Sequence, residues 1–97
     1  MAKKAETSKK IDIEQRARVF KALSDPTRLR MVELLSECET MAGSEMAEKL
    51  GISLALLCHH WRTLEHAGLI TKTKTGQTAS ISLNDQLLSA CLKSGQE

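Results

Sequence analysis

GISLALLCHHWRTLEHAGLI, residues Gly51 to Ile70, is the stretch that decides the fold of this chain. Its first two residues predict a tight turn, and Ser53 is placed to cap the helix that follows. Gly68 offers a left-handed residue at the other end, where helices commonly stop. The stretch therefore predicts a turn, a helix that runs to about Ala67, and an abrupt exit.

Helical spacing divides this predicted helix into two faces. One face carries large apolar side chains: Leu57, Trp61 and Leu64. The other carries small, polar or basic side chains: Ala55, Cys58, His59 and Arg62. We expect the first face to pack inside the protein and the second to contact a partner.

Length and composition suit a single small domain. The chain has 97 residues, 41% of them hydrophobic, and a domain of this size gains stability from dimerisation. Its only aromatic residues are Phe20 and Trp61, so aliphatic side chains must fill the core. The formal charge of +2 is mildly basic and is compatible with a nucleic-acid partner without requiring one.

The start of the chain and its cysteines indicate the cellular compartment. The start, MAKKAETSKK, predicts a disordered basic tail at 1–10 that precedes a folded domain at 11–97. This tail lacks the apolar core of a signal peptide, and no segment is apolar enough to cross a membrane, which predicts a cytoplasmic protein. Cys38, Cys58 and Cys91 are an odd number at wide spacing with no CxxC pair, which argues against a secreted disulfide scaffold.

Three helices are predicted ahead of the central one, over residues 11 to about 23, 26 to 37 or 38, and 43 or 44 to 50. Asp25-Pro26 is a strong start signal, since an acceptor side chain precedes a residue with no N–H to satisfy. Residues 39–41 are expected to form a loop. The predicted inner faces are Ile13, Ala17, Phe20 and Leu23 in the first helix, Leu29, Val32 and Leu35 in the second, and Met46, Ala47 and Leu50 in the third.

Beyond Gly68 the periodicity changes from helical to β-like. Two runs rich in threonine, isoleucine and serine predict a hairpin: Leu69–Lys74 and Thr78–Leu83, with the bend at Thr75-Gly76-Gln77. Asn84 or Asp85 is placed to cap a last helix that runs to about Lys93. Together these elements predict a mainly α fold with a small β-hairpin. This is a winged helix-turn-helix of about five helices and a two-stranded wing.

This arrangement points to double-stranded DNA as the partner. An α-helix fits the major groove, and its first turns present side chains to base edges. Basic side chains on the wing supply phosphate contacts, which dominate affinity. The predicted DNA-binding residues are Ser53, Leu54, Ala55, Cys58, His59, Arg62, Lys72, Lys74 and Gln77.

Three segments resemble the ArsR/SmtB family of metal- and stress-sensing transcriptional repressors. They are ALSDPTRLRMVELL (Ala22 to Leu35), SEMAEKLGIS and CHHWRTLEHAGLI, and the likeness runs from about Phe20 to Leu83. The resemblance implies a homodimer built on the first and last helices. It also implies a pseudo-palindromic operator that is released when an inducer arrives, and therefore a sequence-specific repressor with no cofactor.

The central helix departs from the family pattern. Family members often carry Ser-Gln-Ser-x-Val-Ser at its start, where this chain has Ser-Leu-Ala-Leu-Leu-Cys from Ser53 to Cys58. Base recognition must then depend on the side chains of Ser53, His59 and Arg62, on apolar contact with thymine methyl groups, and on the shape of the DNA. The alternative is a winged-helix module that binds protein instead of DNA.

Neither metal site of the family has its ligands here. The positions of the Cys-x-Cys motif align with Ala42 and Ser44, and no histidine occurs from Asn84 to Glu97. A second group, Cys58, His59, His60 and His66, is also a poor metal site, because neighbouring helical residues point about 100° apart. We predict no metal site and expect His60 to be a packing and hydrogen-bonding residue. A metal-responsive repressor with a non-family site is the remaining metal alternative.

The cysteines suggest a thiol signal instead. Cys58 lies on the predicted DNA-facing side near Arg62, where positive charge favours the reactive thiolate and oxidation would weaken DNA binding. Cys38 and Cys91 are the second candidates, since some thiol-sensing family members pair a second-helix cysteine with a last-helix one. An enzyme is not expected, because no catalytic constellation stands out and the chain has little room for a substrate pocket.

Overall fold

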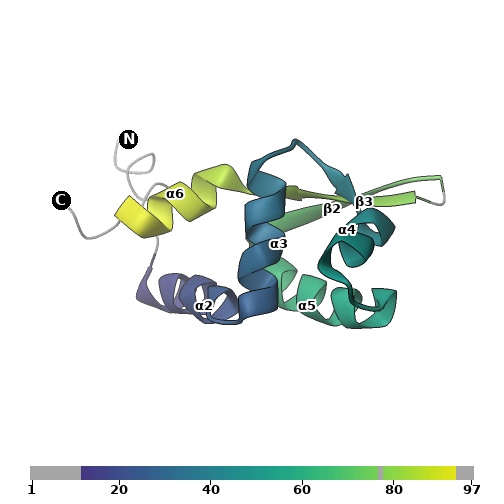
Figure 1. Cartoon of the computed structure of the whole chain (residues 1–97). Helices are drawn as coiled ribbons and strands as arrows, with labels where there is room; N and C mark the ends of the chain where they lie inside the picture. Colours follow the sequence, from purple (N-terminus) through teal and green to yellow (C-terminus); the bar gives the residue numbers. More distant parts are fainter. Residues whose placement is uncertain (1–11, 77, 94–97) are drawn as a thin grey trace.

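The computed structural model describes residues 12–76 and 78–93 (Figure 1). The elements in chain order are α2 (Ile13–Leu23), α3 (Pro26–Ser36), β1 (Met41–Ala42), α4 (Gly43–Leu50), α5 (Leu54–His66), β2 (Ile70–Thr75), β3 (Thr78–Leu83) and α6 (Asp85–Lys93). The predicted winged helix-turn-helix is confirmed, with five helices in the described part of the chain. The predicted basic tail and Gln77 lie outside the described residues.

The start of α3 forms as its sequence predicts. The Asp25 side chain accepts a hydrogen bond from the backbone N–H of Arg28 at 3.0 Å, and Pro26 opens the helix. Proline costs nothing there because the first N–H groups of a helix have no partner within it. The helix ends at Ser36, one residue before the predicted limit.

The helix-turn-helix is built from α4 and α5 and the short turn between them. Gly51 has a φ of +70°, and the N–H of Ile52 donates to the carbonyl of Ala47 at 3.1 Å. These features close α4 in the way that left-handed glycines do. Ser53 then caps α5, because its hydroxyl oxygen accepts from the N–H of Leu56 at 3.0 Å.

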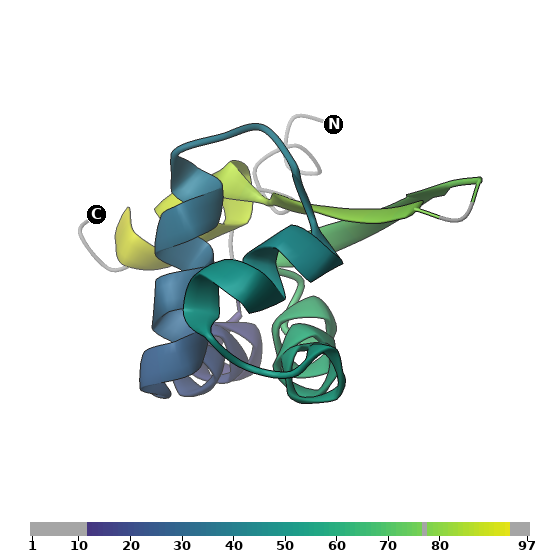
Figure 2. The same ribbon diagram turned by 45° about the vertical axis from the view of Figure 1, so that its right-hand side comes forward.

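The wing is one edge of a small antiparallel sheet. Strands β2 and β3 pair along their whole length from Ile70↔Leu83 to Thr75↔Thr78, and Figure 2 shows the hairpin projecting away from the helices. Strand β1 adds to the other side of β3 through Met41↔Ile81, which gives the order β1-β3-β2. The loop predicted over residues 39–41 is therefore wrong at Met41, because this residue pairs with a strand distant in sequence.

The core lies between α3, α4, α5 and the sheet. Its largest fully buried side chains are aliphatic or sulfur-containing: Met31, Leu35, Met46, Leu57, Leu64, Leu69, Val19, Ile81 and Cys91. Trp61 packs tightly on the start of α4, where a Cβ added to Gly43 would lie 2.9 Å from a carbon of the indole ring. Gly43 is thus needed for the close approach of α5 to α4.

The predicted inner face of α2 is wrong at Ile13, Ala17 and Phe20 in the single chain, whereas Leu23 packs against the core as predicted. Ile13 is 72% exposed and Phe20 is 42% exposed, and Ala17 is exposed with them. Val19 and Ala22 are buried instead, because α2 packs against α3 and α5 through the opposite side. The same correction applies to Leu29 of α3, which is 43% exposed.

Helix α6 lies beside α2, at the end of the molecule opposite the wing (Figure 1). The Arg16 guanidinium donates from Nε to the carbonyl oxygen of Cys91 at 3.2 Å. The predicted cap of α6 is Asn84, whose Oδ1 accepts from the N–H of Leu87 at 3.2 Å. None of the described helices is long and apolar enough to span a membrane.

Candidate nucleic-acid interface

Helix α5 has one buried face and one open face. Leu57, Trp61 and Leu64 are buried in the core, as predicted. The opposite side is exposed and carries the predicted contact residues Leu54, Ala55, His59 and Arg62. Cys58 is half-buried at the edge of this side. An open helix face of small and basic side chains has the shape and chemistry that a major groove accepts.

Ser53 is largely committed to capping. Its oxygen accepts the N–H of Leu56, so one acceptor site is already used. The hydroxyl group can still donate its proton. This suits a phosphate oxygen, which only accepts, better than a base edge that needs both a donor and an acceptor.

The first turn of α5 is unusually apolar for an open surface. Leu54 is 51% exposed and Leu56 is 43% exposed. Leu54 was predicted to contact DNA, but Leu56 was not. Leu56 is one of several neighbouring leucines, and nothing in the sequence distinguishes it from buried Leu57. Exposed leucines at this place can touch only apolar atoms of a partner, and in a DNA groove these are thymine methyl groups.

The wing places two lysines on the same side as α5. Ile70, Lys72 and Lys74 share one face of β2, because alternate strand residues point the same way. Ile70 is buried against the body, and the Lys72 ammonium lies 5.5 Å from the centre of the Trp61 ring. This cation–π contact holds Lys72 at the junction of wing and helix. Lys74 is exposed further along the strand.

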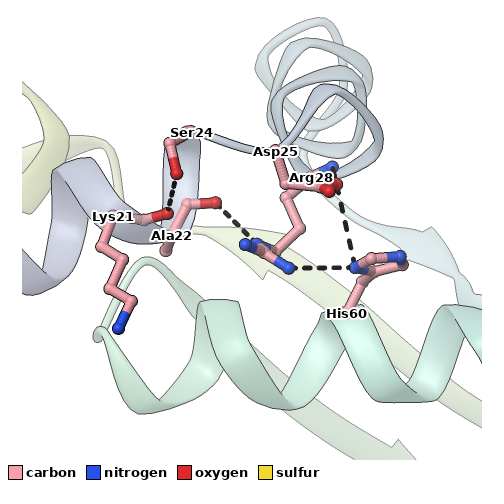
Figure 3. A network of polar contacts seen from close by, with 6 residues as sticks. All are labelled: Lys21, Ala22, Ser24, Asp25, Arg28 and His60. Atoms are coloured by element: carbon pink, nitrogen blue, oxygen red, sulfur yellow. Dashed lines mark hydrogen bonds and ion pairs between the residues drawn. The ribbon is translucent and has the colours of Figure 1, made fainter.

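A polar network joins the α2–α3 corner to α5, as Figure 3 shows. The Arg28 guanidinium donates from Nε to the carbonyl of Ala22 at 2.7 Å, and its Nη1 lies 3.1 Å from Nδ1 of His60. Oδ2 of Asp25 lies 3.9 Å from the same ring nitrogen. The hydrogen bond from the Arg28 N–H holds the pKa of the Asp25 carboxyl below its usual range.

This network was missed at the level of sequence, although His60 was expected to pack and to form hydrogen bonds. Its side chain is only 12% exposed. Arg28 and His60 are far apart in the chain, and no local pattern links them.

The three cysteines lie in different surroundings. Cys91 is fully buried, and this burial raises the pKa of its thiol, which disfavours the reactive thiolate. Cys38 is exposed at an open depression that Glu37, Glu39 and Asp85 also line.

Over residues 12–76 and 78–93, no group of three or more histidine, cysteine, aspartate or glutamate side chains is arranged to hold a metal ion. His59 and His60 contact each other edge to face, with ring centres 5.4 Å apart. Their rings turn toward different neighbours, since His60 meets Arg28 and His59 is exposed.

Comparison with known proteins also identifies a helix-turn-helix domain in this chain. A family model described as "Helix-turn-helix domain" matches residues 23–73. The transcriptional repressor SdpR of Bacillus subtilis is 40% identical over 70 residues, which is 72% of this chain and 77% of that protein.

Solved structures agree with this relationship. A crystal structure of an ArsR family transcriptional regulator has a TM-score of 0.74 and 28% identity, and the match covers 84% of this chain and 82% of the other. The solution structure of a homodimeric winged helix-turn-helix DNA-binding domain, Mb0332 from Mycobacterium bovis, is described as a possible ArsR-family regulator. Its TM-score is 0.73 at 27% identity, over 82% of this chain and 75% of that chain.

The matched region contains the whole helix-turn-helix and part of the wing, which are the elements that form the open basic surface. The relatives are transcriptional regulators rather than enzymes. This chain therefore belongs to the ArsR/SmtB family of winged helix-turn-helix, DNA-binding transcriptional regulators.

Proposed function

We propose that the protein is a homodimeric repressor that acts in the cytoplasm, binds a pseudo-palindromic operator and releases it on an inducing signal. The observation that carries this proposal is the open face of α5 beside a wing whose lysines point the same way. The helix is placed to read base edges and the wing to contact phosphates. Gln77, which follows Gly76 in the sequence, remains a proposed contact.

The homodimer is supported by the apolar side chains that the single chain leaves open. Ile13 and Phe20 on α2, and Leu92 on α6, which is 58% exposed, are large hydrophobic residues on two helices that contact each other. Burying such a group is worth about 1.5–3 kcal/mol for each side chain. A two-fold dimer through α2 and α6 would cover them and present two copies of α5 to successive half-sites.

Fluorescence anisotropy with labelled duplex DNA selected from a random pool tests the proposal. We expect Arg62→Ala and Lys74→Ala each to weaken binding and to reduce the salt dependence of the affinity by roughly one phosphate contact. Arg18→Ala is the matched control, because Arg18 is an exposed arginine that belongs to α2 and not to α5 or the wing. DNA binding that is indifferent to salt, to Arg62→Ala and to Lys74→Ala would favour a protein-binding module instead.

For the inducing signal, we propose oxidation of Cys58. It is half-buried on α5 between the side chains of the open face and the core, so added oxygen meets either DNA or packed neighbours. The thiolate attacks a peroxide oxygen, a sulfenic acid forms, and hydroxide leaves. The burial of Cys91 makes a Cys38–Cys91 pair the weaker proposal.

Serine substitution separates these thiols. Peroxide is expected to release DNA from the wild type and from Cys38→Ser and Cys91→Ser, whereas Cys58→Ser keeps its DNA. Dithiothreitol is expected to restore binding. If Cys58→Ser still releases DNA on oxidation, the assignment to Cys58 is wrong.

A further inference from the structure

A single guanidinium ties the recognition helix to the rest of the domain. Arg28 belongs to the first turn of α3, donates to the carbonyl of Ala22 at the end of α2, and reaches Nδ1 of His60 on α5 (Figure 3). Three helices therefore meet at one side chain. Two of its nitrogens are used at distances of 2.7 and 3.1 Å, which are ordinary hydrogen-bond lengths.

The chemistry of this contact fixes the state of the histidine. An arginine side chain stays protonated and has only donors, so Nδ1 of His60 must accept. His60 is then neutral, with its ring proton on Nε2. The contact cannot form with an imidazolium, since both of its nitrogens carry protons.

We propose that the Arg28–His60 hydrogen bond positions α5 for DNA, and that it exists only while His60 is neutral, so that acid loosens the recognition helix. The inference rests on the proposed function, because DNA affinity is its readout. Arg28 and His60 act here as positioning residues, since neither belongs to the open face of α5.

Protonation changes the partners of His60. The imidazolium would face the like charge of Arg28 at 3.1 Å and the carboxylate of Asp25 at 3.9 Å. Coulomb attraction then favours a move of the ring toward Asp25, which ends the link to Arg28. In the described part of the chain, the ionisable groups in contact with His60 are Arg28 and Asp25 from the α2–α3 corner and His59 from α5 itself.

The first test compares the pH dependence of operator affinity in the wild type and His60→Asn. Asparagine presents an oxygen near the place of Nδ1 and accepts without titrating. Every other ionisable group is the same in the two proteins, so effects of acid elsewhere cancel in the ratio of the two affinities, and this ratio is the readout.

Between pH 7.5 and 5.5, we expect the DNA affinity of the wild type to fall roughly tenfold relative to that of His60→Asn, because one hydrogen bond to a charged group is lost. Parallel pH profiles would overturn the inference. A wild type that binds no DNA at either pH would instead overturn the proposed function.

The second test is a double-mutant cycle at pH 7.5. Arg28→Lys keeps the charge but loses the fork that reaches both Ala22 and His60, and His60→Leu removes the acceptor. Each change is expected to weaken DNA binding roughly tenfold, and the double variant is expected to be little worse than either single one. Circular dichroism at the same pH verifies folding, and His60→Asn must restore affinity that His60→Leu loses. Independent, multiplying effects would show that the two residues are not coupled.

Discussion

At the scale of single residues, Leu54 is the side chain whose role in base reading is most open to test. It projects from the first turn of α5 with about half of its surface exposed, and it has no hydrogen-bonding atom. A thymine methyl group is the apolar feature that a major groove offers it. The readout of this protein is therefore expected to be less polar than hydrogen-bonded base recognition.

Replacing thymine by deoxyuridine in the half-site removes those methyl groups and nothing else. Loss of one buried methyl is worth about 0.8 kcal/mol, so we expect roughly fourfold weaker binding at the contacted positions. Leu54→Ala should bind both duplexes with nearly equal affinity, as measured by anisotropy. Equal affinity of the wild type for both duplexes would show that the methyl groups are not read.

Asp25 has a predictable effect on stability in acid. Its folded-state pKa is depressed, mainly because the Arg28 N–H donates to it, so its contribution is complete above the unfolded value of 3.8 and is lost as the pH falls through the folded one. Asp25→Asn retains a capping oxygen without a charge. Urea unfolding at pH 7 and pH 3 should show a smaller loss of stability in acid for Asp25→Asn than for the wild type. Equal losses would mean that this carboxylate is not responsible.

At the scale of elements, Ser53 caps the start of α5 and is also a proposed DNA contact. Ser53→Ala removes the acceptor for the Leu56 N–H and is expected to cost about 1 kcal/mol of folding stability. Ser53→Asp keeps a cap but sets a negative charge where phosphates approach. We expect it to retain stability in urea unfolding and to lose DNA affinity. If Ser53→Asp binds DNA as well as the wild type, the first turn of α5 lies away from the backbone.

The elements also show which features a sequence can predict. The caps at Asp25 and Ser53 and the turn at Gly51 depend on neighbours within a few residues, so their side-chain chemistry was sufficient. Strand β1 was missed because two residues have no periodicity, and their pairing with β3 is distant in sequence. The Arg28–His60 contact was missed for the same reason.

The prediction of which α2 residues are buried failed for a different reason. Ile13 and Phe20 repeat at helical spacing and are apolar, which predicts an apolar face on this helix. The single chain leaves them open, because its own core takes Val19 and Ala22. Periodicity identifies an apolar face but not whether it packs inside the chain or against a second copy.

At the scale of the whole molecule, this face predicts the assembly. The double change Ile13→Glu and Leu92→Glu places charges on the exposed apolar end of α2 and α6, and we expect a shift from dimer to monomer in sedimentation velocity. Operator affinity should fall by roughly a hundredfold or more, because two linked recognition helices bind together. Arg18→Glu, on another side of α2, is the control for oligomeric state. A double variant that stays dimeric would place the interface elsewhere.

The central claim is that α5 and the wing read a two-fold-symmetric DNA sequence. Selection of duplexes from a random pool by the wild-type protein tests it most directly, followed by affinity measurement of the selected and a scrambled duplex at about 50–200 mM salt. We predict an enriched inverted repeat with half-sites about one helical turn apart and at least roughly a thousandfold preference over the scrambled duplex. No enriched repeat, and equal affinity for both duplexes, would contradict the account.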